Sequence, residues 1–344
     1  MNSYDVIVVG GGPTGLACAI EAKCRGLTHL VLEKGCVVNS LYRYPVNMVF
    51  FTTPELLEIG ELPLVCQREK PTRLEALKYY RLAARHFELN VHQYERVEKI
   101  QGSDGAFEFS TRDRLGVAQR YRSKKTILAT GYYDLPNRMG IPGEDLPKVS
   151  HYYSEAHPYY DCDVAVIGGK NSAAETALDL YRHGARVTLI HRTEALSDRI
   201  KYWVRPDIAN RIRKGEIQAF FNTQVTEILP DCIRLVPAEG ANGKGTNDKE
   251  KGQTLKNDFV LALTGYHPDM EFIQSAGVEM EPTRMRPRCH PETLESNVAG
   301  LYLAGVIIAG LETAEIFIEN GRFHGKQIVA DIAAKLQSRS APSG

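Results

Sequence analysis

A short apolar strand followed by a glycine-containing turn and a helix occurs twice in this chain of 344 residues. The first copy reads YDVIVVGGGPTGLACAIEAK and continues to a strand at HLVLEK; the second reads DVAVIGGKNSAAETALDLYRHGARVTLIHR. In such a unit the helix N-terminus points free amides at an anion, and glycines let a pyrophosphate approach the backbone. Two units predict an α/β fold with two Rossmann-like dinucleotide-binding domains, and hydride transfer between two cofactors.

The first copy carries the full G-x-G-x-x-G fingerprint in Gly10, Gly12 and Gly15. These glycines allow a tight turn, approach of the pyrophosphate, and close packing of helix on strand. The next strand ends in Glu33, whose carboxylate can accept hydrogen bonds from ribose hydroxyls and would repel a 2′-phosphate, although a solvated strand end is the alternative. The site suits FAD or NAD. The residues expected there are Gly10, Gly12, Pro13, Thr14, Gly15, Glu33 and Lys34.

The second copy departs from this fingerprint, because Lys170 stands where the middle glycine would be. Its amine either contacts the pyrophosphate or points to solvent, and the sequence leaves both open. The following strand ends in His191 and Arg192, and an arginine suits a 2′-phosphate, which favours NADPH over NADH. Arg199 and Lys201 either extend this pocket or form a solvated basic loop. The residues expected at the second cofactor are Gly168, Gly169, Lys170, Asn171, Ser172, Ala173, His191, Arg192 and Gly265.

Composition excludes several classes of protein. The 42 basic residues balance 42 acidic ones, so neither a nucleic-acid partner nor a membrane surface is expected. No apolar run approaches membrane-spanning length, and the first strand begins too early for a signal peptide, which favours the cytoplasm. The seven cysteines include no C-x-x-C pair, so we expect neither a disulfide framework nor a metal site.

The order of segments predicts that one domain is inserted in the other. We expect an FAD domain at residues 1–134 plus 267–344 and an NADPH domain at 135–266. A strand ending at Leu128 runs into small residues that let the backbone press against the first dinucleotide, namely Ala129, Thr130 and Gly131. The hydrophilic run 238–252 is expected to be a flexible hairpin loop, and the tail 337–344 to be disordered.

Three longer strings carry a family resemblance: YPVNMVFFTTPELLEIGELP, SHYYSEAHPYYDCDVAVIGGKNSA and EIFIENGRFHG. With them the chain resembles the thioredoxin-reductase-like flavoproteins over nearly its whole length, and among these it looks most like the bacillithiol-disulfide reductases. The resemblance implies FAD, NADPH, reduction of a small-thiol disulfide and a homo-oligomer. It also places Gly305, Ala314 and Glu315 at the flavin, with Val306 where many relatives have an aspartate.

Two further departures bear on the chemistry. Thioredoxin reductases carry C-x-x-C near the start of the nicotinamide domain, where this chain has HYYSEA at 151–156, so a dithiol mechanism is ruled out. Related bacillithiol-disulfide reductases often carry a cysteine in the first glycine turn, where this chain has Thr14. Either the flavin acts without that thiol, or another cysteine such as Cys18 serves, or the substrate differs; we expect Cys18 to be a core residue.

Release of a thiol requires a proton, and His151, His157 and His324 are conceivable donors, although each is more readily a surface or structural histidine. The catalytic residues therefore stay open. The predicted function is NADPH-dependent reduction of a low-molecular-weight disulfide such as bacillithiol disulfide. The alternative is an electron transferase resembling the ferredoxin or flavodoxin NADP reductases, which also lack the dithiol, so the partner is a small disulfide or a small redox protein.

Overall fold

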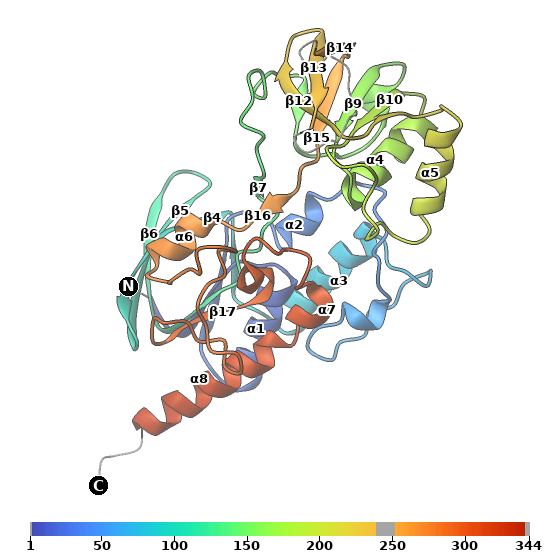
Figure 1. The fold of residues 1–344 in the computed structure, drawn as a ribbon. Helices are drawn as coiled ribbons and strands as arrows, with labels where there is room; N and C mark the ends of the chain where they lie inside the picture. The colour runs from blue at the N-terminus through green and yellow to red at the C-terminus, as the bar shows by residue number, and fades with distance from the viewer. Residues whose placement is uncertain (1, 239–251, 341–344) are drawn as a thin grey trace. The chain divides into compact units, whose positions relative to one another are not determined.

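The computed structural model describes residues 2–238 and 252–340, and these form two compact units (Figure 1). The first unit combines the residues up to Leu135 with those from Tyr266 onward, and the second is Pro136–Gly265. Short strands β7 (Leu135–Pro136) and β16 (Tyr266–His267) stand at the two crossings and pair with each other. At each end, the second unit is one residue shorter than the interval 135–266 that the sequence predicts.

The first unit is built on a sheet with strand order β3-β2-β1-β6-β5-β4. β1 (Asn2–Val9) lies between β2 (His29–Glu33) and β6 (Ala118–Leu128), and both pairings are parallel. The end of β6 also pairs in parallel with β17 (Leu301–Leu303), whereas its beginning pairs antiparallel with β5 (Ala106–Asp113). The carboxyl ends of β2, β1, β6 and β17 therefore share one edge, where parallel α/β sheets bind ligands. The remaining strands are β3 (Val91–Gln93) and β4 (Glu95–Ser103).

Helices α1 (Pro13–Cys24) and α8 (His324–Ser340) pack against each other on this sheet (Figure 1). Pro13 fits the first turn of α1, where its missing N–H costs nothing, and Gly26, at φ +71°, follows the helix end. α3 (Arg73–His86) begins with a capping box formed by Thr72 and Glu75. The other helices of this unit are α2 (Asn39–Tyr42), η1 (Pro54–Leu56), α6 (Met270–Ser275), η3 (Gly305–Ala309) and α7 (Ile318–Gly321).

The second unit has its own parallel sheet, with strand order β11-β10-β9-β15-β8. β9 (Asp163–Ile167) leads through the second glycine-containing turn into α4 (Asn171–Arg182), and β10 (Arg186–Ile190) returns beside β9. A separate antiparallel sheet contains β12, β13 and β14. The remaining elements are β8 (Val149–Ser150), η2 (His157–Tyr159), α5 (Arg205–Arg213), β11 (Gln218–Phe220), β12 (Thr223–Ile228), β13 (Cys232–Pro237), β14 (Gln253–Lys256) and β15 (Phe259–Ala262).

Two local predictions, the disordered tail and the hairpin loop, have different outcomes. The tail is helical as far as Ser340, so the predicted disorder of 337–344 is wrong for Gln337–Ser340. The buried residues Ile328, Val329 and Ile332 explain this, because they anchor α8 and the helix continues past them. Most of the predicted loop 238–252 lies outside the described residues, although β13 and β14 on either side of it do pair antiparallel.

Candidate functional site

The first glycine turn is a cradle of bare backbone at the carboxyl edge of the sheet. Gly10 has φ +109°, and a Cβ there would lie 2.3 Å from the Ala129 carbonyl oxygen. A Cβ on Gly15 would lie 1.9 Å from the Gly10 oxygen, so α1 can approach β1 this closely only with glycine at that position. A Cβ on Gly12 would meet nothing within 4 Å. Gly12 therefore borders open space in front of the N-terminus of α1, as a pyrophosphate cradle requires.

Glu33 closes one side of this cradle. Its Oε2 accepts a hydrogen bond from the Gly11 amide and its Oε1 one from the Gly35 amide, both at 2.7 Å. The side chain is buried, which raises the pKa of the carboxyl, while the two amides oppose that shift. The carboxylate is thus fixed in place, and the alternative of a solvated strand end is wrong. Lys34 beside it forms an ion pair with Asp134 at 2.8 Å.

The segment after β6 supplies a polar atom that nothing in the described structure satisfies. The Ala129 amide donates to the Val9 carbonyl at 2.8 Å, which holds this segment beside the glycine turn. The Thr130 Oγ1 atom is buried and has no hydrogen-bond partner among the described residues. Gly131 has φ +72° and leaves its surroundings open, because a Cβ there would have its nearest neighbour 3.9 Å away. A buried orphan hydroxyl beside a glycine cradle fits a polar ligand such as a dinucleotide.

Thr14 is packed against two glycines from the C-terminal part of the chain. A Cβ on Gly305 would lie 3.2 Å from its Oγ1, and a Cβ on Gly321 would lie 3.1 Å from the same atom. Cys18, one turn along α1, is fully buried, and burial raises the pKa of its thiol to about 12. The thiolate is therefore not formed near neutral pH, and Cys18 cannot replace a cysteine at position 14 as a nucleophile.

The segment that holds Ala314 and Glu315 is fixed by an arginine that the sequence did not indicate. Both carboxylate oxygens of Glu315 accept hydrogen bonds from Arg286, at 2.6 and 2.7 Å. The Glu315 amide donates to the Glu312 carbonyl within a turn. These contacts fix the position of the segment. Arg286 lies in an aperiodic stretch, so no pattern in the sequence connects it with Glu315.

The second glycine-containing turn differs from the first in what covers it. Gly168 has φ +149°, and a Cβ there would lie 2.6 Å from the Leu263 carbonyl oxygen and 3.0 Å from the Ala173 Cβ. A Cβ on Gly169 would lie 2.2 Å from the His191 imidazole, so that ring packs directly over the turn. Lys170 has φ −109° and an exposed side chain, so the departure from glycine costs no backbone strain there.

A short segment after β10 is clamped to the start of α4. The Ser197 amide donates to the Gly169 carbonyl at 2.9 Å. Asn171 accepts from the Lys201 amide at 2.8 Å and donates to the Arg199 carbonyl at 3.1 Å. The Lys201 side chain is buried, with the residue 6% exposed, and its Nζ lies 2.6 Å from Glu175. Lys201 is therefore engaged away from solvent, and neither a phosphate-pocket role nor a solvated loop describes it.

Three basic side chains at this turn have no partner within the described chain. They are Lys170, Arg192 and Arg199, all exposed. Elsewhere in the second unit the structure pairs most arginines with acids, for example Arg186 with Asp161 and Asp163. Unpaired cations gathered at a helix N-terminus favour an anion with several phosphate charges. Burial, and to a lesser extent Arg192, lowers the pKa of His191.

Two other residues expected at the site, His151 and Gly265, make contacts within the second unit. His151 lies between two acceptors of its own unit, with Nδ1 3.2 Å from the Ala262 carbonyl and Nε2 3.4 Å from Glu144 Oε1. Glu144 is itself buried and accepts from two backbone amides. This arrangement gives His151 a role in fixing the loop at Glu144. Gly265 has φ +100°, and its carbonyl accepts from the Asn137 amide at 2.9 Å.

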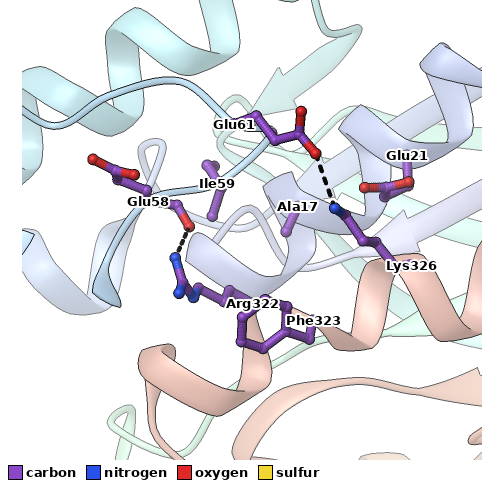
Figure 2. Close-up of a pocket in the computed structure, with 9 residues that line it drawn as sticks. Ala17, Glu21, Glu58, Ile59, Glu61, Arg322, Phe323 and Lys326 are labelled. Atoms are coloured by element: carbon purple, nitrogen blue, oxygen red, sulfur yellow. Dashed lines mark hydrogen bonds and ion pairs between the residues drawn. The ribbon is translucent and has the colours of Figure 1, made fainter. Parts of the chain in front are cut away.

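A cavity of about 140 Å³ lies beside α1, and Figure 2 shows the residues that line it. Ala17 and Glu21 line it and lie on the face of α1 that also carries Thr14, since the three are spaced three and four residues apart. Two interactions cross its rim, Lys326 with Glu61 at 3.1 Å and Arg322 with the Glu58 carbonyl at 3.0 Å. Its volume is below the roughly 300–1,000 Å³ of small-molecule sites, so it is no cofactor pocket.

Neither a membrane span nor a metal site is found in the described part of the chain. None of the helices in residues 2–238 and 252–340 is long and apolar enough to cross a membrane. Within the same residues no group of three or more His, Cys, Asp or Glu side chains is placed to hold a metal ion. All seven cysteines are free.

The chain has clear relatives among known families and proteins. The model of the pyridine nucleotide-disulphide oxidoreductases matches residues 7–305. The chain belongs to this family. It is therefore a flavin oxidoreductase, using flavin and nicotinamide cofactors as family members do. The bacilliredoxin reductase Bdr of Bacillus subtilis (strain 168) is 44% identical over 338 residues, which cover 97% of this chain and 99% of the relative.

Solved structures agree with this assignment to the pyridine nucleotide-disulphide oxidoreductases. The bacillithiol disulfide reductase Bdr from Bacillus cereus is 43% identical with a TM-score of 0.91, covering 97% of this chain and 100% of that one. The bacillithiol disulfide reductase Bdr from Staphylococcus aureus is 40% identical with a TM-score of 0.90, covering 97% and 99%. A T. acidophilum thioredoxin reductase, 18% identical with a TM-score of 0.73 and covering 98% and 100%, shares the fold. The predicted fold class and family are confirmed.

Proposed function

We propose that the first unit holds FAD, that the second holds NADPH, and that the enzyme uses them to reduce a low-molecular-weight disulfide, with bacillithiol disulfide as the expected substrate. One contrast carries the cofactor assignment. The first glycine turn is flanked by the buried carboxylate of Glu33, whereas the second is flanked by the unpaired side chains of Lys170, Arg192 and Arg199. A carboxylate suits free ribose hydroxyls, and an arginine suits a 2′-phosphate.

In the first unit the residues of this chain bind FAD and fix its position. Gly10, Gly12 and Gly15 leave room for the pyrophosphate in front of α1, and Glu33 and the Thr130 hydroxyl offer polar contacts beside it. When bound, the flavin supplies hydride acceptance from the nicotinamide and delivery of two electrons to the acceptor. The further residues proposed to contact FAD are Pro13, Thr14, Lys34, Ala129, Gly131, Gly305, Ala314 and Glu315.

In the second unit the chain's part is to bind the anionic nucleotide. The N-terminus of α4 faces the turn at Gly168, and the Asn171 clamp holds the segment 197–201 next to it. We assign Arg192 to the 2′-phosphate, since a guanidinium binds phosphate oxygens through two parallel hydrogen bonds. The further residues proposed to contact NADPH are Gly169, Lys170, Ser172, Ala173, His191 and Gly265.

The proposal includes reduction of the disulfide without a cysteine of this chain at the first turn. Thr14 cannot form a mixed disulfide, and Cys18 is buried with a thiol pKa of about 12. The substrate is taken from the relatives, two of which are named bacillithiol disulfide reductases and a third bacilliredoxin reductase. Our proposal also includes a homo-oligomer, because the scaffold that the chain resembles commonly dimerises, and light scattering of the purified protein tests this. It further includes a location in the cytoplasm.

The test is the stoichiometry of turnover with the purified, flavin-loaded enzyme. Disulfide reduction consumes one NADPH for every two thiols formed, and we expect that ratio with bacillithiol disulfide, measured as NADPH absorbance and thiol titration under anaerobic conditions. NADPH consumption without thiol would refute disulfide reduction. If ferredoxin or flavodoxin then accepts the electrons, the electron-transferase alternative replaces the proposal.

A further inference from the structure

His324 connects the C-terminal helix to the carboxyl edge of the first sheet. It is the first residue of α8, and its Nδ1 accepts a hydrogen bond from the Gly305 amide at 3.0 Å. Only Ala304 separates Gly305 from β17, and the Ala304 amide still donates to the Leu128 carbonyl of β6 at 2.8 Å. The bond therefore fixes the chain at the point where it leaves the sheet, beside the first glycine turn.

The backbone that His324 holds is packed tightly against Thr14. Gly305 is buried with φ +80°, and a Cβ there would lie 3.2 to 3.4 Å from three atoms of Thr14. A Cβ on Gly321 of α7 would lie 3.1 Å from the same hydroxyl oxygen. A displacement of Gly305 is therefore transmitted to Thr14, the second residue of α1, and so to the end of α1 that faces the cradle.

The bond requires a neutral ring, because a protonated Nδ1 cannot accept. Burial lowers the pKa of His324 to about 4, and burial is the sole cause of that shift. The charged groups nearest in sequence on α7 and α8 are engaged elsewhere: Arg322 binds the Glu55 and Glu58 carbonyls and interacts with Glu319, and Lys326 pairs with Glu61. Thr14 of α1 and Gly305 of η3 carry no charge. The ring is neutral near pH 7, which argues against His324 as one of the conceivable proton donors and favours the alternative of a structural histidine.

We propose that His324 is a positioning residue of the flavin site, where its neutral imidazole holds Gly305 against Thr14 and thereby keeps the first cradle in the shape that retains the cofactor. The inference rests on the proposed FAD site in the first unit. His324 does not act on the substrate; it acts through the Gly305 backbone. Protonation of the ring removes the acceptor, so retention of the flavin becomes sensitive to pH where His324 titrates.

The experiment measures the rate of flavin release from the holoenzyme, followed by the rise of flavin fluorescence, between pH 6.5 and pH 4. Three variants are compared with the unaltered chain. His324→Asn offers an amide oxygen near the position of Nδ1 but does not titrate, and His324→Ala offers no acceptor. The matched control is His290→Ala, because exposed His290 also accepts backbone amides through Nδ1, at 3.2 and 3.3 Å, but away from the cradle.

Near neutral pH we expect His324→Ala to release flavin about tenfold faster, the effect of one lost hydrogen bond of roughly 1.4 kcal/mol, while His324→Asn and the His290 control stay near the unaltered rate. As the pH falls, carboxylates such as Glu33 titrate in every variant, so the ratio of the unaltered rate to the His324→Asn rate isolates the imidazole. We expect this ratio to rise toward pH 4.

A ratio that stays flat, or a His324→Asn variant that releases flavin as fast as His324→Ala near neutral pH, overturns the inference while leaving the FAD site in place. A protein that is purified without flavin and does not bind added FAD overturns the proposed function, and this inference with it. The two failures are thus distinguished by the flavin content of the unaltered chain.

Discussion

Removal of the Arg192 side chain is expected to weaken the binding of NADPH but not that of NADH. Arg192 is exposed and has no partner in the described chain, so its truncation leaves no buried charge and breaks no internal contact. A hydrogen bond to a charged group contributes about 1.5–3 kcal/mol, and the exposure of Arg192 argues for the lower half of that range. A loss of about 2 kcal/mol corresponds to a roughly 30-fold weaker interaction.

The assay is kcat/KM for NADPH and for NADH with Arg192→Ala, together with the dissociation constants of NADP⁺ and NAD⁺. We expect the NADPH values to fall about 30-fold and the NADH values to stay within about twofold, because NADH lacks the 2′-phosphate. Arg213→Ala is the matched control, since Arg213 is an exposed arginine of the same unit that contacts Asn210. Equal losses for NADPH and NADH would refute the assignment of Arg192 to the 2′-phosphate.

Three further predictions concern the first unit. Gly15→Ala places a Cβ 1.9 Å from the Gly10 oxygen, so we expect lower flavin content and a stability loss of about 3 kcal/mol or more in denaturant titrations; an unaltered midpoint would contradict the packing. Cys18→Ser should keep disulfide reduction while lowering stability by about 1–3 kcal/mol, because a hydroxyl replaces a buried thiol, and loss of turnover in a folded variant would make Cys18 catalytic. His324 has a pKa of about 4 when folded and 6.5 when unfolded, so the unfolded state binds more protons between these values. The free energy of unfolding should therefore fall by up to about 3 kcal/mol as the pH drops from 6.5 to 4, and His324→Asn should lack that part; identical pH profiles would contradict it.

The parts of the fold that follow local rules were predictable from the sequence. The glycine spacing at Gly10, Gly12 and Gly15 needs a strand before it and a helix after it, and the structure has both. The capping residues Thr72 and Glu75 likewise fix the start of α3. Such signals act over a few residues, so they can be recognised without knowledge of the tertiary structure.

The parts of the site that depend on distant contacts could not be predicted. The Arg286–Glu315 pair and the His324–Gly305 bond join segments with no shared pattern, and their residue types are common on surfaces. The sequence left Lys201 either in the phosphate pocket or in a solvated basic loop, but Glu175 of α4 pairs with it in a buried position. Burial and partner identity arise from tertiary packing, which a local pattern does not contain.

The proposed function is tested most directly by anaerobic stopped-flow absorbance on the purified enzyme. The flavin is first reduced with one equivalent of NADPH and then mixed with bacillithiol disulfide, or in a parallel experiment with ferredoxin or flavodoxin. We predict rapid recovery of the oxidised flavin band with the disulfide, although position 14 is a threonine. Fast recovery with ferredoxin or flavodoxin, and none with the disulfide, would contradict it.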